Sequence, residues 1–256
     1  MKVFKFGGAS VKNADAVRNV AQILSHFKED KILMIVSAMG KTTNELEAIC
    51  NSQYYNNENK EELLNESIGF HMEICDELGL KEHPVRKEIE DDWKTIPQLI
   101  QQHQDRDYDF IYDQVISLGE WASTKIVSAY LNEQNVKNDW LESMHCIKTD
   151  NTYKEGKVNW KKTLKCCKKE IQPLLKNTNI VVTQGFTGES KEGFTTTLGR
   201  EGSDYSAAIF SYCLDAESMT VWKDVPGILN ADPRKFKNVS KLDKISYREA
   251  TEMTYY

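Results

Sequence analysis

The sequence of 256 residues lacks any long hydrophobic run. Its longest aliphatic stretch, ILMIV at residues 32–36, is far shorter than the roughly 20 apolar residues of a membrane-spanning helix. The first residues, MKVFKFGG, also lack the apolar segment of a secretory signal peptide. These absences exclude a membrane-spanning helix and predict a cytoplasmic protein.

An excess of positive charge is missing as well. The chain has 33 Lys and Arg residues against 39 Asp and Glu residues, a net charge of -6. Such a chain has no overall attraction for nucleic acids or anionic membranes, so neither is expected as a partner. Any anionic ligand must instead be attracted by local positive charge. With 40% hydrophobic and 28% charged residues, the composition is that of a globular protein, and one large α/β domain is favoured over two small ones.

The cysteines and histidines form no recognisable site pattern. The six cysteines include no CxxC pair, and no histidine has zinc-site spacing. None of the five histidines has a neighbouring serine or cysteine that would suggest a nucleophile and its base. We therefore expect reduced thiols and no metal site built by the protein.

Two common nucleotide-binding patterns are also absent. GKTT at residues 40–43 resembles the end of a Walker A loop, but Ile35 occupies the position of the required earlier glycine. The chain has neither an HRD nor a DFG segment, which excludes a protein kinase. What remains is a polar loop, residues 37–44, after a predicted strand. In parallel α/β sheets, ligands bind at the edge formed by the carboxyl ends of the strands, where this loop would lie.

The order of the patterned segments predicts an α/β fold. Short β-prone or apolar runs at residues 2–6, 31–40, 179–184 and 218–224 predict strands. Residues 43–135 are dominated by helical periodicity. The apolar second strand is typical of a parallel sheet covered by helices on both faces. The polar segment NSQYYNNENKEE, residues 51–62, is the best candidate for a mobile excursion.

A glycine turn after the first predicted strand suggests a phosphate-binding element. Lys5 precedes Gly7 and Gly8, and a predicted helix follows. Glycine lets the backbone N–H groups approach phosphate oxygens, and a lysine supplies a fixed positive charge. By itself, a Gly-Gly turn is more often purely structural.

Two later loops also contain charged residues beside predicted turns. Arg200 precedes EGSD, the expected start of a helix with Ser203 as its cap, and this combination suits a carboxylate. After the strand at 218–224, Asp232 and Arg234 flank a further turn, which suits a nucleotide. Taken singly, Arg200 could serve a surface ion pair, and DVPG and ADPR are common turn sequences.

Seven segments, in order, resemble the motifs of aspartokinases in the amino-acid kinase family. They are KFGGASV, VSAMGKTTNEL, SLGEWAST, QGFTG, TTTLGREGSDYSAA, WKDVPGILNADPR and ISYREATEMTYY. The match runs from Lys2 to the last residue, although residues 51–112 contain no recognised segment. The resemblance implies one catalytic domain over residues 1–256. It also implies a three-layer α/β/α sandwich around a mainly parallel sheet of about eight strands.

The resemblance implies roles for individual residues. Lys5, Gly7 and Gly8 would hold the ATP phosphates, with Lys5 and Asp204 catalytic. The residues implied for aspartate binding are Ser37, Thr43, Glu120, Phe186, Arg200 and Ser203. The residues implied for nucleotide binding are Lys223, Asp224, Leu229, Asp232 and Arg234; Lys223 and Leu229 depart from the residues common in the family. Lys5 and Arg200 should then face each other across a shared cleft. Taken singly, Glu120 could be a solvated helix residue and Asp204 an acid at a helix N-terminus.

The implied reaction is ATP-dependent phosphorylation of the L-aspartate side chain to 4-phospho-L-aspartate, toward lysine, threonine and methionine. A carboxylate with a pKa of about 3.9 needs no general base, which fits the missing catalytic histidine. Mg²⁺ would arrive with ATP and bind mainly through phosphates and water. The alternatives are a relative acting on glutamate or N-acetylglutamate, and a non-catalytic nucleotide- or amino-acid-binding regulator.

The end of the sequence leads to a further expectation. ISYREATEMTYY stops without a glycine cap or a closing strand, as in a truncated chain. The family typically continues into a Gly-Ala segment of the nucleotide site and then into ACT domains. The resemblance thus predicts a homo-oligomer for the full-length form. For these 256 residues it predicts weak or absent activity, without feedback inhibition by lysine or threonine.

Overall fold

The computed structural model describes residues 1–225 and 227–255, which divide into two compact units, Met1–Trp222 and Lys223–Tyr256. The elements of the first unit are β1 (Lys2–Phe6), η1 (Gly8–Val11), α1 (Ala14–Leu24), β2 (Ile32–Val36), α2 (Thr42–Tyr54), α3 (Lys60–Glu77), α4 (Pro84–Gln102), α5 (Tyr108–Glu133), β3 (Asn138–Leu141), η2 (Ser143–His145), α6 (Trp160–Asn177), β4 (Ile180–Gln184), β5 (Thr187–Glu189), β6 (Thr195–Thr197), α7 (Gly202–Cys213) and β7 (Ser218–Trp222). Here η denotes a 3₁₀ helix. Among its described residues, the second unit has one helix, α8 (Tyr247–Tyr255).

Five parallel strands form the central sheet in the order β3-β4-β2-β1-β7. The four predicted strands are all present, as β1, β2, β4 and β7. Every residue of β2 and β4 is buried, as expected for inner strands covered on both faces. The α/β class and the mainly parallel sheet are therefore confirmed.

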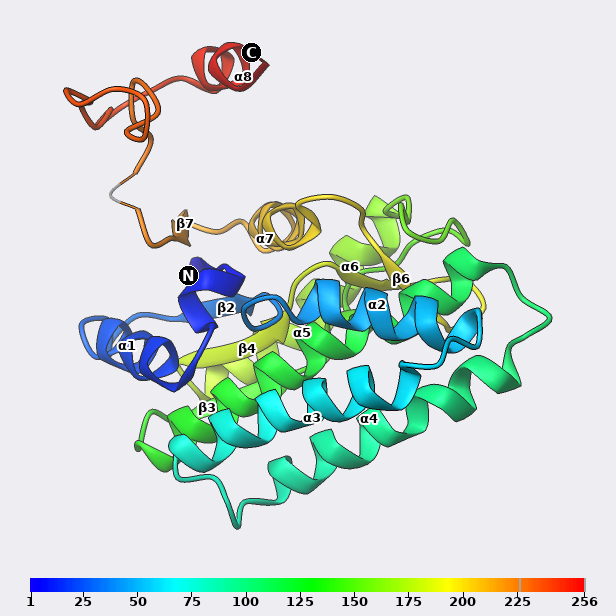
Figure 1. Cartoon of the computed structure of the whole chain (residues 1–256). Helices are drawn as coiled ribbons and strands as arrows, with labels where there is room; N and C mark the ends of the chain where they lie inside the picture. Colours follow the sequence, from blue (N-terminus) through cyan, green and yellow to red (C-terminus); the bar gives the residue numbers. More distant parts are fainter. Residues whose placement is uncertain (226, 256) are drawn as a thin grey trace. The chain divides into compact units, whose positions relative to one another are not determined.

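Alternate residues of the inner strands pack into two separate cores. In β2, Ile32, Met34 and Val36 join α1–α5 in one hydrophobic cluster. Leu33 and Ile35, which point to the other face, join α6 and α7 in a second cluster. Side chains alternate along a strand, so helices on both faces produce three layers (Figure 1). This arrangement confirms the predicted α/β/α sandwich.

The sheet differs from the implied count of about eight strands. Among the described residues, five strands form the parallel sheet, and β5 and β6 form a separate antiparallel hairpin. Neither β3 nor this hairpin was predicted from the sequence. The hairpin lies within the segment that connects β4 to α7, so it fixes the path of the chain toward Arg200.

The helical region is confirmed as α2–α5, which form one layer of the first unit (Figure 1). Most of the polar segment at residues 51–62 belongs to the end of α2 and the start of α3, and a short turn joins the two helices. In that turn, Asn56 has a φ of 55°, and the N–H of Asn57 donates to the carbonyl of Ser52. Asparagine tolerates this left-handed conformation better than most residues.

The described residues of the second unit have little regular structure besides α8. An isolated bridge joins Leu229 and Lys241, and Gly227 has a φ of 136° beside the Lys241 side chain. Whether both units belong to one catalytic domain stays a prediction. In the described part of the chain, no helix has the length and apolar character needed to cross a bilayer.

Candidate functional site

Three loops that follow parallel strands lie at the same edge of the sheet. Gly7 follows β1, Ser37 follows β2 and Gly185 follows β4. The N–H of Ser37 donates to the carbonyl of Phe6 at 3.0 Å, so the first two loops continue the pairing of their strands. Because all three strands are parallel, these segments meet at the edge where ligands bind in such sheets.

Gly8 brings the first two loops into direct contact. A Cβ atom at this position would lie 2.8 Å from the carbonyl oxygen of Ala38, closer than real Cβ atoms approach. The N–H of Gly40 also donates to the carbonyl of Gly8 at 3.2 Å. The glycine is therefore required by the neighbouring backbone. The turn continues into the 3₁₀ helix η1, and the predicted helix follows as α1.

A second close approach joins the end of β4 to the start of α7. A Cβ on Gly185 would lie 2.7 Å from the Cα of Ser203, and a Cβ on Gly202 would lie 2.5 Å from the Phe186 ring. Phe186 itself has a φ of 61°, an uncommon conformation for an aromatic residue. The two glycines let the first turn of α7 approach this edge of the sheet.

Lys5 and Asp204 form an ion pair between β1 and α7. The Nζ of Lys5 lies 2.5 Å from Oδ1 of Asp204. Lys5 is buried, with 6% exposure, whereas the Asp204 side chain is 30% exposed. A Cβ on Gly7 would lie 3.6 Å from the same Nζ, so the ammonium group stands beside the glycine turn. The two predicted catalytic residues are thus in direct contact.

Glu120 on α5 contacts the first turn of α7, which also contains Asp204. Its Oε1 accepts a short hydrogen bond from the Ser203 hydroxyl, and its side chain is only 4% exposed. Burial raises the pKa of Glu120 to about 7, while the Ser203 hydrogen bond and the charge of Lys5 act in the opposite direction. Its buried Oε2 makes no hydrogen bond within the described part of the molecule. The alternative that Glu120 is a solvated helix residue is therefore wrong.

The role of Ser203 as helix cap is also wrong. The helix begins at Gly202, and its N-cap is Glu201, whose φ is 57° and whose side chain makes no capping hydrogen bond. Ser203 lies inside the first turn, where its hydroxyl binds Glu120. Its predicted contact with a substrate stays a prediction.

Arg200 lies in the turn immediately before α7. Its neighbours Gly199 and Glu201 both have left-handed backbones, with φ of 78° and 57°. The arginine is exposed and forms no ion pair or side-chain hydrogen bond with the described residues. Its position, four residues before Asp204, places it near the Lys5 pair along the chain. That Lys5 and Arg200 face each other across a cleft stays a prediction.

The remaining candidates of the first unit come from the loop after β2 and the start of α2. Ser37 and Thr43 are both partly buried, and Thr43 is the second residue of α2. The hydroxyl of Ser123 on α5 donates to the carbonyl of Ser37 at 2.7 Å. The helix that carries Glu120 thus also holds this loop.

The five predicted nucleotide-binding residues lie in the second unit. There Asp232 and Arg234 are paired with each other: Oδ2 of Asp232 lies 3.0 Å from the Arg234 guanidinium, and Oδ1 accepts the backbone N–H of Arg234 at 2.9 Å. Lys223 and Asp224 are exposed, and Leu229 is partly buried. Their role in binding a nucleotide stays a prediction.

Sequence reasoning did not identify two buried polar residues of α5. Asp113 has no exposed surface and binds backbone groups of two other segments, and Ser123 holds the loop at Ser37. Both belong to the helix that carries Glu120. The sequence did contain an indication of their importance: both are polar residues on the apolar stripe of a helix, and a buried polar side chain needs a hydrogen-bond partner.

Among the described residues, no group of three His, Cys, Asp or Glu side chains could hold a metal ion. Two acidic groups of this site already have partners, Asp204 with Lys5 and Glu120 with Ser203. The arrangement offers positive charge and buried acceptors, which suit anionic phosphates and an amino acid.

The chain belongs to the amino acid kinase family, whose family model matches residues 1–256. The curated relatives that it resembles are aspartokinases, which confirms the resemblance found in the sequence. It is 33% identical to the bifunctional aspartokinase/homoserine dehydrogenase of Buchnera aphidicola, over 100% of this chain and 32% of that protein. It is 31% identical to the lysine-sensitive aspartokinase 3 of Escherichia coli, over 99% of this chain and 56% of that protein.

The fold agrees with solved structures of the same class. Aspartokinase III of E. coli in complex with aspartate and ADP matches with a TM-score of 0.91 and 30% identity, over 100% of this chain and 56% of that one. Its complex with lysine and aspartate matches with a TM-score of 0.86 over 96% of this chain and 54% of that one. The chain therefore spans between a third and a little over half of the length of these relatives.

Proposed function

We propose that the protein of this sequence transfers the γ-phosphoryl group of ATP to the side-chain carboxylate of L-aspartate. The product would be 4-phospho-L-aspartate, the starting point of lysine, threonine and methionine synthesis. One observation carries the proposal: Lys5 and Glu120 meet consecutive residues of α7, Asp204 and Ser203, at the ligand-binding edge of the sheet. The similarity to aspartokinases and the complex of one relative with aspartate and ADP support the same reaction.

The substrate side of the site would combine Arg200 and Glu120. Arg200 is exposed and presents a guanidinium that can bind a carboxylate through two parallel hydrogen bonds. Glu120 offers a buried acceptor for the substrate ammonium group, and the positive charge of that group would lower the pKa of Glu120 on binding. An acetylated amine could not do this, so the pair favours a free amino acid.

The phosphoryl side would use Lys5, with Gly7 and Gly8 holding the phosphates. The attacking carboxylate is ionised at neutral pH, so repulsion between two anions is the main obstacle to reaction. Lys5 would offset this repulsion at the transferring group, while Asp204 fixes the position of its ammonium. Mg²⁺ bound to the ATP phosphates would supply further charge compensation.

An ADP-release assay across three acceptors tests the proposal. The full-length protein should release ADP with L-aspartate and not with glutamate or N-acetylglutamate. A preference for glutamate or N-acetylglutamate would assign the chain to another acceptor. Nucleotide or aspartate binding without any turnover in the full-length protein would favour the alternative of a non-catalytic regulatory protein. The proposal includes a cytoplasmic location and a homo-oligomer for the full-length form.

A further inference from the structure

Two buried carboxylates of α5 hold the segment that carries Arg200 at both ends. Asp113 and Glu120 are seven residues apart, two turns along one face of the helix, about 10 Å along its axis. Asp113 binds Thr197 and Glu120 binds Ser203. Arg200 lies midway between these partners, three residues from each.

Asp113 connects three parts of the first unit. Its Oδ1 accepts the Thr197 hydroxyl at 2.7 Å, and its Oδ2 accepts the backbone N–H groups of Thr197 at 2.8 Å and of Lys154 at 2.9 Å. The side chain has no exposed surface, and burial raises its pKa to about 6. Without this carboxylate, two backbone donors in a buried place would lose their acceptor.

The turn at Lys154 lies directly against the Arg200 segment. The N–H of Gly156 donates to the carbonyl of Thr197 at 2.8 Å, and Glu155 pairs with Leu198 in an isolated bridge. A Cβ on Gly199 would lie 3.4 Å from the carbonyl oxygen of Lys154. By fixing both Thr197 and Lys154, Asp113 therefore determines where the left-handed turn around Arg200 begins.

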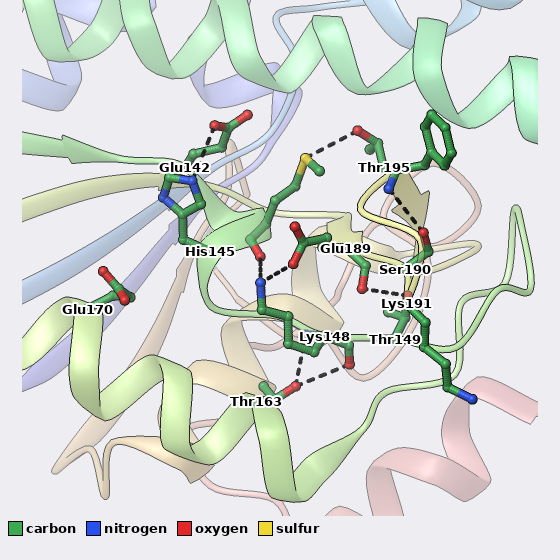
Figure 2. A network of polar contacts seen from close by, with 12 residues as sticks. Glu142, His145, Lys148, Thr149, Thr163, Glu170, Glu189, Ser190, Lys191 and Thr195 are labelled. Carbon is green, nitrogen blue, oxygen red and sulfur yellow. Dashed lines mark hydrogen bonds and ion pairs between the residues drawn. The ribbon is translucent and has the colours of Figure 1, made fainter.

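The rest of the hairpin has contacts that do not involve Asp113. Gln114 accepts the N–H of Thr195 at 3.1 Å and donates to its carbonyl at 2.8 Å. Figure 2 shows the opposite strand, where Glu189 pairs with Lys148 and its carbonyl accepts the N–H of Thr149 at 2.8 Å. Loss of Asp113 should thus release the end of β6 and the Arg200 turn while β5 remains attached.

We propose that Asp113 is a positioning residue for substrate binding, because it fixes the turn from which Arg200 contacts the aspartate carboxylate. The inference rests on the proposed function and extends it to a residue that touches no substrate. An effect on the binding of aspartate, without an equal effect on ATP, distinguishes this role from general support of the fold.

The experiment compares Asp113→Ala, Asp113→Asn and the control Ser128→Ala in the full-length protein. Asparagine keeps an acceptor for the two backbone donors and can donate to the Thr197 hydroxyl, so it should restore function. Ser128 lies on the same helix and is buried, and its hydroxyl donates to Asn138 at 2.6 Å, away from the Arg200 turn. Asp113→Ala should raise the KM for aspartate at least tenfold and that for ATP less than twofold. In Asp113→Asn and Ser128→Ala, the KM values for both substrates should stay within threefold of the wild-type values.

An unchanged aspartate KM in Asp113→Ala, or an equal rise for both substrates, would overturn the proposal. So would a similar rise in Ser128→Ala. If Asp113→Ala does not fold, Thr197→Val replaces it. Valine removes the hydroxyl hydrogen bond to Asp113 and keeps the backbone hydrogen bond. The KM for aspartate should then rise twofold to fivefold, and an unchanged KM would contradict the inference.

Hydrogen exchange separates this inference from the proposed function. The amides of Leu198, Gly202 and Asp204 donate to Phe186, Gly199 and Glu201, and report on the turn without any turnover. In Asp113→Ala they should exchange at least tenfold faster than in the wild type, while the amides of β2 do not change. Equal rates would refute the positioning role even in an inactive protein. Faster exchange in a protein that neither binds nor phosphorylates aspartate would refute only the proposed reaction.

Discussion

The ammonium of Lys5 and the carboxylate of Asp204 are 2.5 Å apart and join the second strand from one edge of the sheet to the first turn of α7. Lys5 is almost fully buried, whereas Asp204 remains partly open to solvent. The ion pair fixes the direction of the buried ammonium. The pair thus provides a positive group of defined position beside the glycine turn.

Replacing Lys5 with alanine should abolish phosphoryl transfer while ATP still binds. The charge of Lys5 acts mainly on the transferring group, and the amides of the glycine turn would still bind the nucleotide. Steady-state ADP release and calorimetric titration with ATP measure the two effects separately. Lys2→Ala is the matched control, because Lys2 lies on the same strand and pairs with Asp30 at 2.9 Å at its opposite end. An unchanged kcat in Lys5→Ala would exclude the catalytic role.

Replacing Arg200 with alanine should weaken the binding of aspartate. The loss of a charged hydrogen bond costs roughly 1.5–3 kcal/mol, which corresponds to a KM about 10 to 150 times higher. Kinetics with each substrate varied in turn measure the effect. Arg18→Ala is the control, since Arg18 is an exposed arginine paired with Asp15 on α1. If only the KM for ATP changed, the substrate carboxylate would have to bind elsewhere.

Replacing Glu120 with glutamine should change the pH dependence of stability. The pKa of Glu120 is raised from 4.5 to about 7, so between these values the folded protein binds a proton that the unfolded chain has released. The contribution of Glu120 to stability is therefore complete below about pH 4.5 and is lost as the pH rises through about 7. Glutamine does not titrate, so the variant should lose less stability than the wild type over this range.

Denaturation of both proteins at several pH values measures this difference. Asp113, with its pKa raised to about 6, and His71, with its pKa lowered to about 4, contribute equally to both curves and cancel in the comparison. Parallel curves would show that Glu120 does not change its pKa on folding. The same variant should also discriminate less against acceptors without a free amine, and unchanged selectivity would argue against its contact with the substrate amine.

The inner strands could be predicted from the sequence because they are buried on both faces. The run at Ile32–Val36 is continuously apolar, and the structure reproduces it as β2. The missed strand β3, with the sequence NDWL, is an edge strand whose Asn138 is held by a buried hydrogen bond from Ser128. Its polar composition gives no strand pattern, since its place is decided by tertiary contacts.

The candidate site was predictable only as a set of motifs. Glu120 and Ser203 are 83 residues apart, and no periodicity indicates that they meet. The ordered resemblance to a family supplied that link. Asp113 was missed for a different reason: two of its three hydrogen bonds come from backbone N–H groups, at Thr197 and Lys154, and a backbone group has no residue type to recognise.

A pair of glycine substitutions tests the close contact of the first two loops. In Gly8→Ala the new methyl group would meet the carbonyl oxygen of Ala38 at 2.8 Å, so one of the two loops must move. We expect a loss of stability of about 1–3 kcal/mol, as for overpacking, and weaker binding of ATP. Gly69→Ala is the control, because Gly69 lies exposed on α3 with no atoms near its Cβ position. There alanine should stabilise the protein by about 0.5–1 kcal/mol. Urea denaturation and ATP titration measure both variants, and a Gly8→Ala protein as stable as Gly69→Ala would disprove the contact between the loops.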